Sequence, residues 1–156
     1  MDERNHLEMK AIIGSDHAGI SGRKEAARVF LERGWEVHEK GPEGDSEKAD
    51  YPDIAHLIAH SVTSGESMFG VLVCGTGQGM AMTANRYQGA RAAVITDAFT
   101  AEMSRAHNDA NIACFGERVI GADAIADLLG TFLDTPFEEG RHLKRVDKID
   151  KVTGEA

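Results

Sequence analysis

The chain has 156 residues, of which 42% are hydrophobic, and these values are typical of one globular domain with a sizeable core. Its formal net charge of −9 disfavours nucleic acid and anionic membrane as partners, because both bind basic surfaces. Two cysteines cannot build a disulfide framework, and no apolar run is long enough for a membrane span or an export signal. We therefore expect a cytoplasmic protein, with residues 1–8 as a flexible extension ahead of a single domain over 9–156.

Strand-like and helix-like patterns alternate along the chain. The predicted strands are short apolar runs at 10–14, 35–38, 71–74, 91–95 and 111–115. The predicted helices lie at 21–33, 52–62, through 82–85 after the glycine turn, at 98–107 after the capping residue Asp97, at 121–133 and at 138–149. A polar loop is expected over 41–50. This alternation predicts an α/β fold, a three-layer α/β/α sandwich around a Rossmann-like five-stranded parallel sheet.

A parallel sheet of this kind binds ligands at the carboxyl ends of its strands. Polar residues follow four of the predicted strands, and they are Asp16-His17, the segment 74–79, Thr96-Asp97 and Glu117-Arg118. We expect the functional site to draw on these positions.

The segment 71–79 is the most distinctive, since an apolar strand runs into Cys74 and then glycine alternates with Thr76 and Gln78. Backbone amides at such a turn attract anions and stabilise a thiolate, so Cys74 is a candidate base or nucleophile. The alternative is a small buried residue at a strand end. The spacing fits neither a P-loop nor a G-x-G-x-x-G dinucleotide loop. Met80 stands where a cysteine phosphatase would need an arginine, which argues against phosphocysteine chemistry.

Seven short motifs occur in one order, and they are Asp16-His17, Tyr51-Pro52, 74–79, Ala84-Asn85, His107-Asn108-Asp109-x-Asn111, Phe115-Gly116-x-Arg118 and Gly140-Arg141-His142-x-x-Arg145. Together they resemble the type B ribose-5-phosphate isomerases and the related galactose-6-phosphate and allose-6-phosphate isomerases, over residues 9–149. The resemblance implies a cofactor-independent aldose–ketose isomerase without a metal, which interconverts D-ribose 5-phosphate and D-ribulose 5-phosphate through an enediolate.

The resemblance also assigns catalytic roles. Cys74 is the expected base, because the family's alternative base is a glutamate at the position that Met80 occupies here. Thr76 is expected to carry a proton between the two substrate oxygens, and His107, with Asp16 nearby, to open the sugar ring. The expected donors to the enediolate oxygens are the amides of the loop from Gly75 to Gly79, in which Gly77 and Gln78 are also named as substrate-binding residues.

The implied substrate-binding residues are His17, Arg118, Arg141 and Arg145 for the phosphate, Asn108 for a hydroxyl group and Tyr51 for the pocket wall. Without the resemblance, Arg141 and Arg145 would be read as solvated, although their spacing of four lets them converge on one phosphate if they lie on a helix. The family further implies a homodimer or tetramer in which each active site is shared between subunits.

The sequence leaves alternatives open for the substrate and for turnover itself. Gln78 and Ala81 depart from residues common in the family, so an isomerase of allose 6-phosphate, galactose 6-phosphate or a tetrose phosphate stays open, as does a sugar-phosphate sensor without turnover. His56 and His60 have metal-ligand spacing but no further ligand, and we expect them to be solvated. Cys114 is expected in the core, and His142 in a structural or exposed position.

Overall fold

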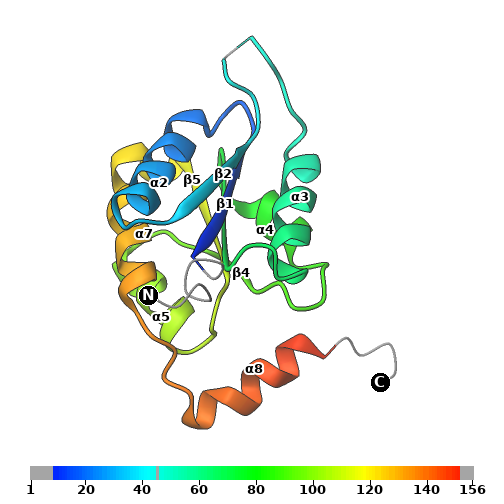
Figure 1. The fold of residues 1–156 in the computed structure, drawn as a ribbon, viewed down its shortest axis with the longest axis vertical. Helices are drawn as coiled ribbons and strands as arrows, with labels where there is room; N and C mark the ends of the chain where they lie inside the picture. Colours follow the sequence, from blue (N-terminus) through cyan, green and yellow to red (C-terminus); the bar gives the residue numbers. More distant parts are fainter. Residues whose placement is uncertain (1–8, 45, 152–156) are drawn as a thin grey trace.

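The computed structural model describes residues 9–44 and 46–151 (Figure 1), so the expected extension over 1–8 lies outside the described residues. Five parallel strands form one sheet in the order β2-β1-β3-β5-β4. The strands are β1 (Lys10–Ser15), β2 (Glu36–Lys40), β3 (Phe69–Cys74), β4 (Ala92–Val94) and β5 (Ile112–Gly116). The predicted α/β class with a five-stranded parallel sheet is confirmed.

Helices cover both faces of the sheet (Figure 1). One layer contains α2 (Ile20–Glu32), α5 (Ala98–Ala106) and α7 (Ala122–Asp134), and the other contains α3 (Tyr51–Thr63) and α4 (Gln78–Ala84). The chain ends in a 3₁₀ turn, η1 (Gly140–His142), and in α8 (Leu143–Asp150), which extends away from the sheet (Figure 1). Among the described helices, none has the length and apolar character that a membrane crossing requires.

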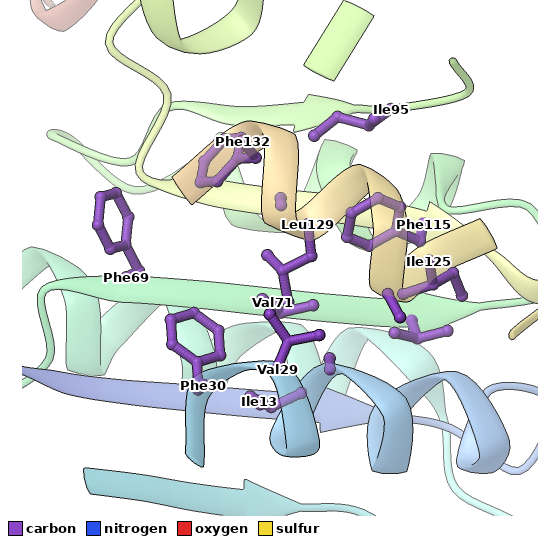
Figure 2. Close-up of a cluster of buried hydrophobic side chains, with 14 of the residues drawn as sticks. Ile13, Val29, Phe30, Phe69, Val71, Ile95, Phe115, Ile125, Leu129 and Phe132 are labelled. Carbon is purple, nitrogen blue, oxygen red and sulfur yellow. The ribbon is translucent and has the colours of Figure 1, made fainter. Parts of the chain in front are cut away.

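The strands alternate their side chains between two cores. Ile13, Val71 and Phe115 pack with Phe30 of α2 and Leu129 of α7 in the first core (Figure 2). The second core lies against α3 and α4 and contains Ile12, Leu72, Cys74 and Cys114. Cys74 therefore faces the α3 and α4 layer.

A fully buried arginine joins the ends of β1 and β2 at the carboxyl edge of the sheet. Arg23 Nη1 donates to Ser15 Oγ at 2.9 Å, and Nη2 donates to the Pro42 carbonyl oxygen at 2.8 Å. Its Nε also donates to Glu39 at 3.2 Å. A buried guanidinium needs such partners, and here they fix the start of the loop that carries Asp16.

Two elements differ from the expectation. A four-residue helix, α6 (Glu117–Ile120), follows β5, and it is too short to produce a periodic pattern in the sequence. The last helix begins later than position 138, because Glu139 and Gly140 adopt φ values of 60° and 52° and turn the chain sharply before η1.

Candidate active site

Cys74 ends β3 and is almost fully buried. The backbone N–H of Gly77 donates a hydrogen bond to its Sγ at 3.1 Å. Gly77 adopts φ +80°, which is accessible to glycine at little cost, and this turn brings the amide back onto the sulfur. The loop 75–77 thus wraps around the thiol and holds it at the carboxyl edge of the sheet.

The loop is confined on two sides. A Cβ on Gly116, at the end of β5, would lie 2.6 Å from the backbone of Thr76, and a Cβ on Gly79 would overlap the ring of Tyr51. Tyr51 opens α3, so the loop is held between that helix and β5. The two glycines are needed for close approach, and Tyr51 packs directly on the loop beside Cys74. Its place on the wall of a substrate pocket stays a prediction.

The amides of the loop are only partly free for a ligand. Gly77 N–H is bound to Cys74 Sγ, and Gln78 N–H donates to Thr76 Oγ1 at 3.3 Å. Thr76 is exposed, so its hydroxyl remains within reach of a ligand. Of the five amides from 75 to 79 that are expected as donors, those of Gly77 and Gln78 already have partners within the loop. The donor role of the loop stays a prediction.

Asp16 and His17 follow β1 and lie at the same edge. Asp16 is buried and accepts a hydrogen bond from Ala18 N–H at 2.9 Å, which shapes the turn after the strand. His17 Nδ1 is buried and has no hydrogen-bond partner within residues 9–44 and 46–151. A buried polar atom without a partner costs free energy, so this nitrogen is suited to a ligand that supplies the missing bond.

Arg118 and Glu117 follow β5. Arg118 N–H donates to the Gly75 carbonyl oxygen at 3.1 Å, and its guanidinium lies beside Gly75. The Glu117 carboxylate accepts a hydrogen bond from Gly22 N–H in the first turn of α2. We call Asp16, His17, Tyr51, 74–79 and Arg118 the carboxyl-edge group.

The remaining predicted residues form a second set, the amino-edge group, which comprises His107, Asn108, Arg141 and Arg145. His107 follows the last residue of α5 and precedes β5, so it lies where that strand begins. Register pairs Gly70 with Ile112 and Cys74 with Gly116, and four residues of strand span about 13 Å. Within one chain, Cys74 and Asp16 therefore lie at the opposite edge of the sheet from His107. The expected proximity of His107 and Asp16 stays a prediction for a site shared between two chains.

His107 belongs to a compact cluster with Glu138 and His142. The imidazole rings of His107 and His142 stack with centroids 4.2 Å apart and planes inclined by 12°. Glu138 Oε2 lies 3.7 Å from His107 Nε2 and 3.5 Å from His142 Nε2. His142 is buried rather than exposed, and its burial lowers its pKa, as do neighbouring His107 and Arg141.

The three side chains have the composition of a metal site, but their geometry does not fit one. An imidazole nitrogen binds a metal in the plane of its ring, and two nearly parallel stacked rings cannot both direct a lone pair at one ion. The sequence did not lead us to expect a role for Glu138 or the burial of His142. Their separation of four residues was the feature of the sequence that could have indicated a contact between them.

The position of α8 is fixed at both ends. Ahead of its start and of η1, Glu138 N–H donates to the carbonyl oxygen of Ala106, the last residue of α5, at 3.0 Å. At its other end, Arg91 Nη1 donates to Asp150 at 2.9 Å, while Arg91 Nε donates to the Asp109 carbonyl oxygen at 2.8 Å. Arg141 and Arg145 are exposed on the segment between these two anchors.

Other candidates have structural roles. Asp97 caps α5 by accepting from Thr100 N–H at 2.7 Å, which lowers the pKa of Asp97 and confirms the predicted cap. Asn85 exchanges two hydrogen bonds with the backbone of Ala92, each 2.8 Å long. Cys114 is fully buried, as predicted, and burial raises the pKa of its thiol. His56 is exposed and is bonded to Tyr87.

Comparison with known proteins identifies the family. The model of the family described as "Ribose/Galactose Isomerase" matches residues 11–149. The chain belongs to this family. The resemblance drawn from the seven motifs is confirmed, and with it the class of enzyme, a sugar-phosphate isomerase that interconverts an aldose and a ketose.

Several members of the ribose/galactose isomerase family are similar over nearly their whole length. Ribose-5-phosphate isomerase B of Escherichia coli is 39% identical, with 92% of this chain and 95% of that protein covered. D-erythrulose-4-phosphate isomerase of Pectobacterium atrosepticum is 35% identical, with 88% and 90% covered. The structure of ribose-5-phosphate isomerase B from Clostridium thermocellum has a TM-score of 0.87 at 47% identity, with 91% and 95% covered.

Proposed function

We propose that this chain interconverts D-ribose 5-phosphate and D-ribulose 5-phosphate in the cytoplasm, through an enediolate intermediate. The observation that supports this best is the setting of Cys74, a buried thiol held by the Gly77 amide beside the exposed hydroxyl of Thr76. The similar ribose-5-phosphate isomerases, at 39% and 47% identity, support the choice of sugar. Both cysteines are free thiols, in keeping with a reducing compartment.

The chemistry requires two proton transfers on the open sugar. A base moves a proton from C2 to C1, and a second proton moves from the O2 hydroxyl to O1, so that the aldehyde becomes a hydroxymethyl group and C2 becomes a ketone. We assign the first transfer to Cys74 and the second to Thr76. The free amides of Gly75 and Gly79 are our donors to the negative oxygens of the enediolate.

Ring opening and phosphate binding fall to the other residues. His107 moves the proton of the anomeric hydroxyl to the ring oxygen as the bond between C1 and that oxygen breaks. The phosphate is bound by His17 and Arg118 from one side and by Arg141 and Arg145 from the other, and Asn108 binds a sugar hydroxyl. Charge-assisted bonds of this kind offset the acidic balance of the whole chain.

We further propose that the active site is shared between two copies of the chain in a homodimer, or in a tetramer of such dimers. The support is the separation of the carboxyl-edge group from the amino-edge group by about 13 Å of strand. A pentose phosphate whose C1 and C2 lie at Cys74 cannot also place C1 and its ring oxygen at His107 of the same chain. A second copy can offer its amino-edge group to the first copy's Cys74, as an isologous interface allows.

A second candidate is a tetrose-phosphate isomerase, because the erythrulose-phosphate relative is 35% identical over 137 residues. A panel of ribose 5-phosphate, erythrulose 4-phosphate, allose 6-phosphate and galactose 6-phosphate distinguishes the candidates. We expect the highest kcat/KM for ribose 5-phosphate, with allose 6-phosphate at least about tenfold lower, because a displacement of the reacting carbon by about 1 Å costs up to a hundredfold. Solvent deuterium should also enter C1 of the product, and a sensor without a base would incorporate none.

A further inference from the structure

His142 links the two kinds of functional residue in the amino-edge group. One face of its ring stacks on His107, at 4.2 Å between centroids. On its edge, Arg141 Nε donates a hydrogen bond to His142 Nε2 at 3.4 Å. His142 is buried, whereas Glu138, Arg141 and Arg145 around it are exposed. One side chain therefore contacts both the residue assigned to ring opening and a residue assigned to the phosphate.

The backbone around His142 is shaped to make this contact. Glu138 N–H is bonded to Ala106 in the last turn of α5, and His142 N–H donates to the Glu139 carbonyl oxygen at 3.0 Å. Between them, Glu139 has φ +60°, an unfavourable value for a residue with a side chain, and Gly140 has φ +52°. Such a conformation persists where the surrounding structure fixes it, and here it returns the chain so that His142 covers His107.

The charges around His142 favour its neutral form. An Nε2 that accepts from Arg141 has a free lone pair, which a fully protonated ring lacks. Burial lowers the pKa of His142, and His107, Arg141 and Arg145 lower it further, against the opposite effect of Glu138. A neutral His142 adds no positive charge beside His107, whose Nε2 lies 3.7 Å from Glu138 Oε2.

We propose that His142 is a positioning residue of this isomerase, whose ring orients His107 by stacking and whose Nε2 orients Arg141, so that both act on the substrate at a fixed separation. The proposal rests on the proposed function. Ring opening occurs at C1 and the phosphate lies on C5, so the two residues address opposite ends of one molecule. Errors of about 1 Å in such an arrangement cost up to about a hundredfold in rate. A rigid link between His107 and Arg141 would prevent such errors.

Two substitutions separate the two contacts. His142→Phe keeps a stacking ring but removes the acceptor, and we expect KM for ribose 5-phosphate to rise by about fivefold or more with kcat retained, because only the phosphate contact is loosened. His142→Gln keeps an acceptor but removes the ring, and we expect kcat from ribose 5-phosphate to fall by about tenfold or more. Ribulose 5-phosphate is acyclic, so its kcat in the His142→Gln variant should change much less.

The matched control is His60→Gln, which alters an exposed histidine on α3 and should leave both parameters unchanged. Thermal unfolding of each variant separates loss of fold from loss of positioning. The proposal is overturned if the two His142 variants change kcat and KM by the same factors. It is also overturned if His142→Gln slows the acyclic substrate as much as the cyclic one, or if neither variant changes any parameter.

A substrate-free measurement tests the stack itself. The NMR signal of His107 Hε1, assigned with a His107→Gln variant, should show the upfield ring-current shift of a stacked ring in the wild type and in His142→Phe, and lose it in His142→Gln. A signal unchanged in His142→Gln overturns the proposal. Failure of the proposed function has a different signature, a wild-type protein with an intact stack that does not turn over ribose 5-phosphate.

Discussion

At the scale of single residues, Cys74 bears most of the proposed chemistry. A hydroxyl group is a far poorer base than a thiol near pH 7, so Cys74→Ser should reduce kcat by at least about a hundredfold, the usual contribution of a positioned base. Serine is close in size, and the unfolding temperature should hardly change. Cys114→Ala is the control, because Cys114 is buried in β5 and should be replaced without loss of turnover. Wild-type activity in Cys74→Ser would remove the cysteine from the mechanism.

The two cysteines should also differ in reactivity. Only the thiolate is nucleophilic, and burial, reinforced by neighbouring Cys74, raises the pKa of Cys114, so that this thiol stays protonated as the pH rises through neutrality. Iodoacetamide at pH 7 to 8 should therefore label Cys74 alone, and ribose 5-phosphate should slow the labelling. Peptide mass spectrometry reads the result. Carboxamidomethylated Cys114 in folded protein would contradict its assignment to the core.

Gly116 allows a test of whether the position of the loop 75–77 matters for turnover. Gly116→Ala would put a Cβ 2.6 Å from the backbone of Thr76, which must then move together with the loop around Cys74. A shift of about 1 Å there should lower kcat by one to two orders of magnitude. Gly130→Ala is the control, because this helical glycine faces only the flexible end of Arg33, and alanine in a helix stabilises by up to about 1 kcal/mol. Equal kcat in both variants would show that the loop tolerates displacement.

Single-residue signals in the sequence identified most of the carboxyl-edge group, because Asp16, the segment 74–79 and Arg118 come just after strands, and strand ends of a parallel sheet converge. Tyr51 opens α3 after a long loop, and it was expected at the site only from the family resemblance. The same logic could have separated His107 from Asp16, since a residue between α5 and β5 must lie at the opposite edge. The burial of His142 could not be read in this way. It depends on the positive φ values of Glu139 and Gly140, and a residue with a side chain, such as Glu139, adopts a positive φ only rarely.

At the scale of elements, α8 is an arm whose position depends on few contacts. Asp150→Asn removes the charge that Arg91 binds, and should let the far end of α8 move together with Arg145. A partly exposed ion pair contributes up to about 1 kcal/mol, so KM for ribose 5-phosphate should rise by up to about fivefold while kcat stays within twofold. Asp147→Asn, an exposed carboxylate on the same helix, should change neither. A raised KM in both variants would point to net charge instead of the pair.

Long elements with a clear period were predicted within a few residues, and so was the cap of α5, because Asp97 and Thr100 are close in sequence and make their contacts locally. The start of the last helix was not. The segment ahead of it is held by the tertiary hydrogen bond from Glu138 N–H to the Ala106 carbonyl oxygen, and a pattern within the segment itself contains no trace of that partner.

At the scale of the whole molecule, the two edge groups allow a test of the shared active site. Cys74→Ser and His107→Ala chains, each nearly inactive alone, should form mixed dimers with one intact site, composed of Cys74 from one copy and His107 from the other. Random pairing of equal amounts should restore about a quarter of wild-type activity. Coexpression followed by isolation through two different tags provides the mixed dimer free of the parent dimers, and this mixed dimer should have about half of wild-type activity because one of its two sites is intact. A site contained within one chain would restore nothing.

The carboxylate of Glu117 at the first turn of α2 has a consequence for the choice of ligand in a crowded metabolite pool. Proteins with a doubly wound sheet often hold a nucleotide by placing its diphosphate on the first helix amides, which carry partial positive charge. In this chain one of those amides, that of Gly22, is already bonded to an internal anion, the Glu117 carboxylate. Adenine nucleotides, present in cells at high concentration, would have to displace a tethered carboxylate to bind there. The first turn of α2 is therefore a poor site for a diphosphate, and an assay of the proposed isomerase in millimolar ATP should run as it does in buffer.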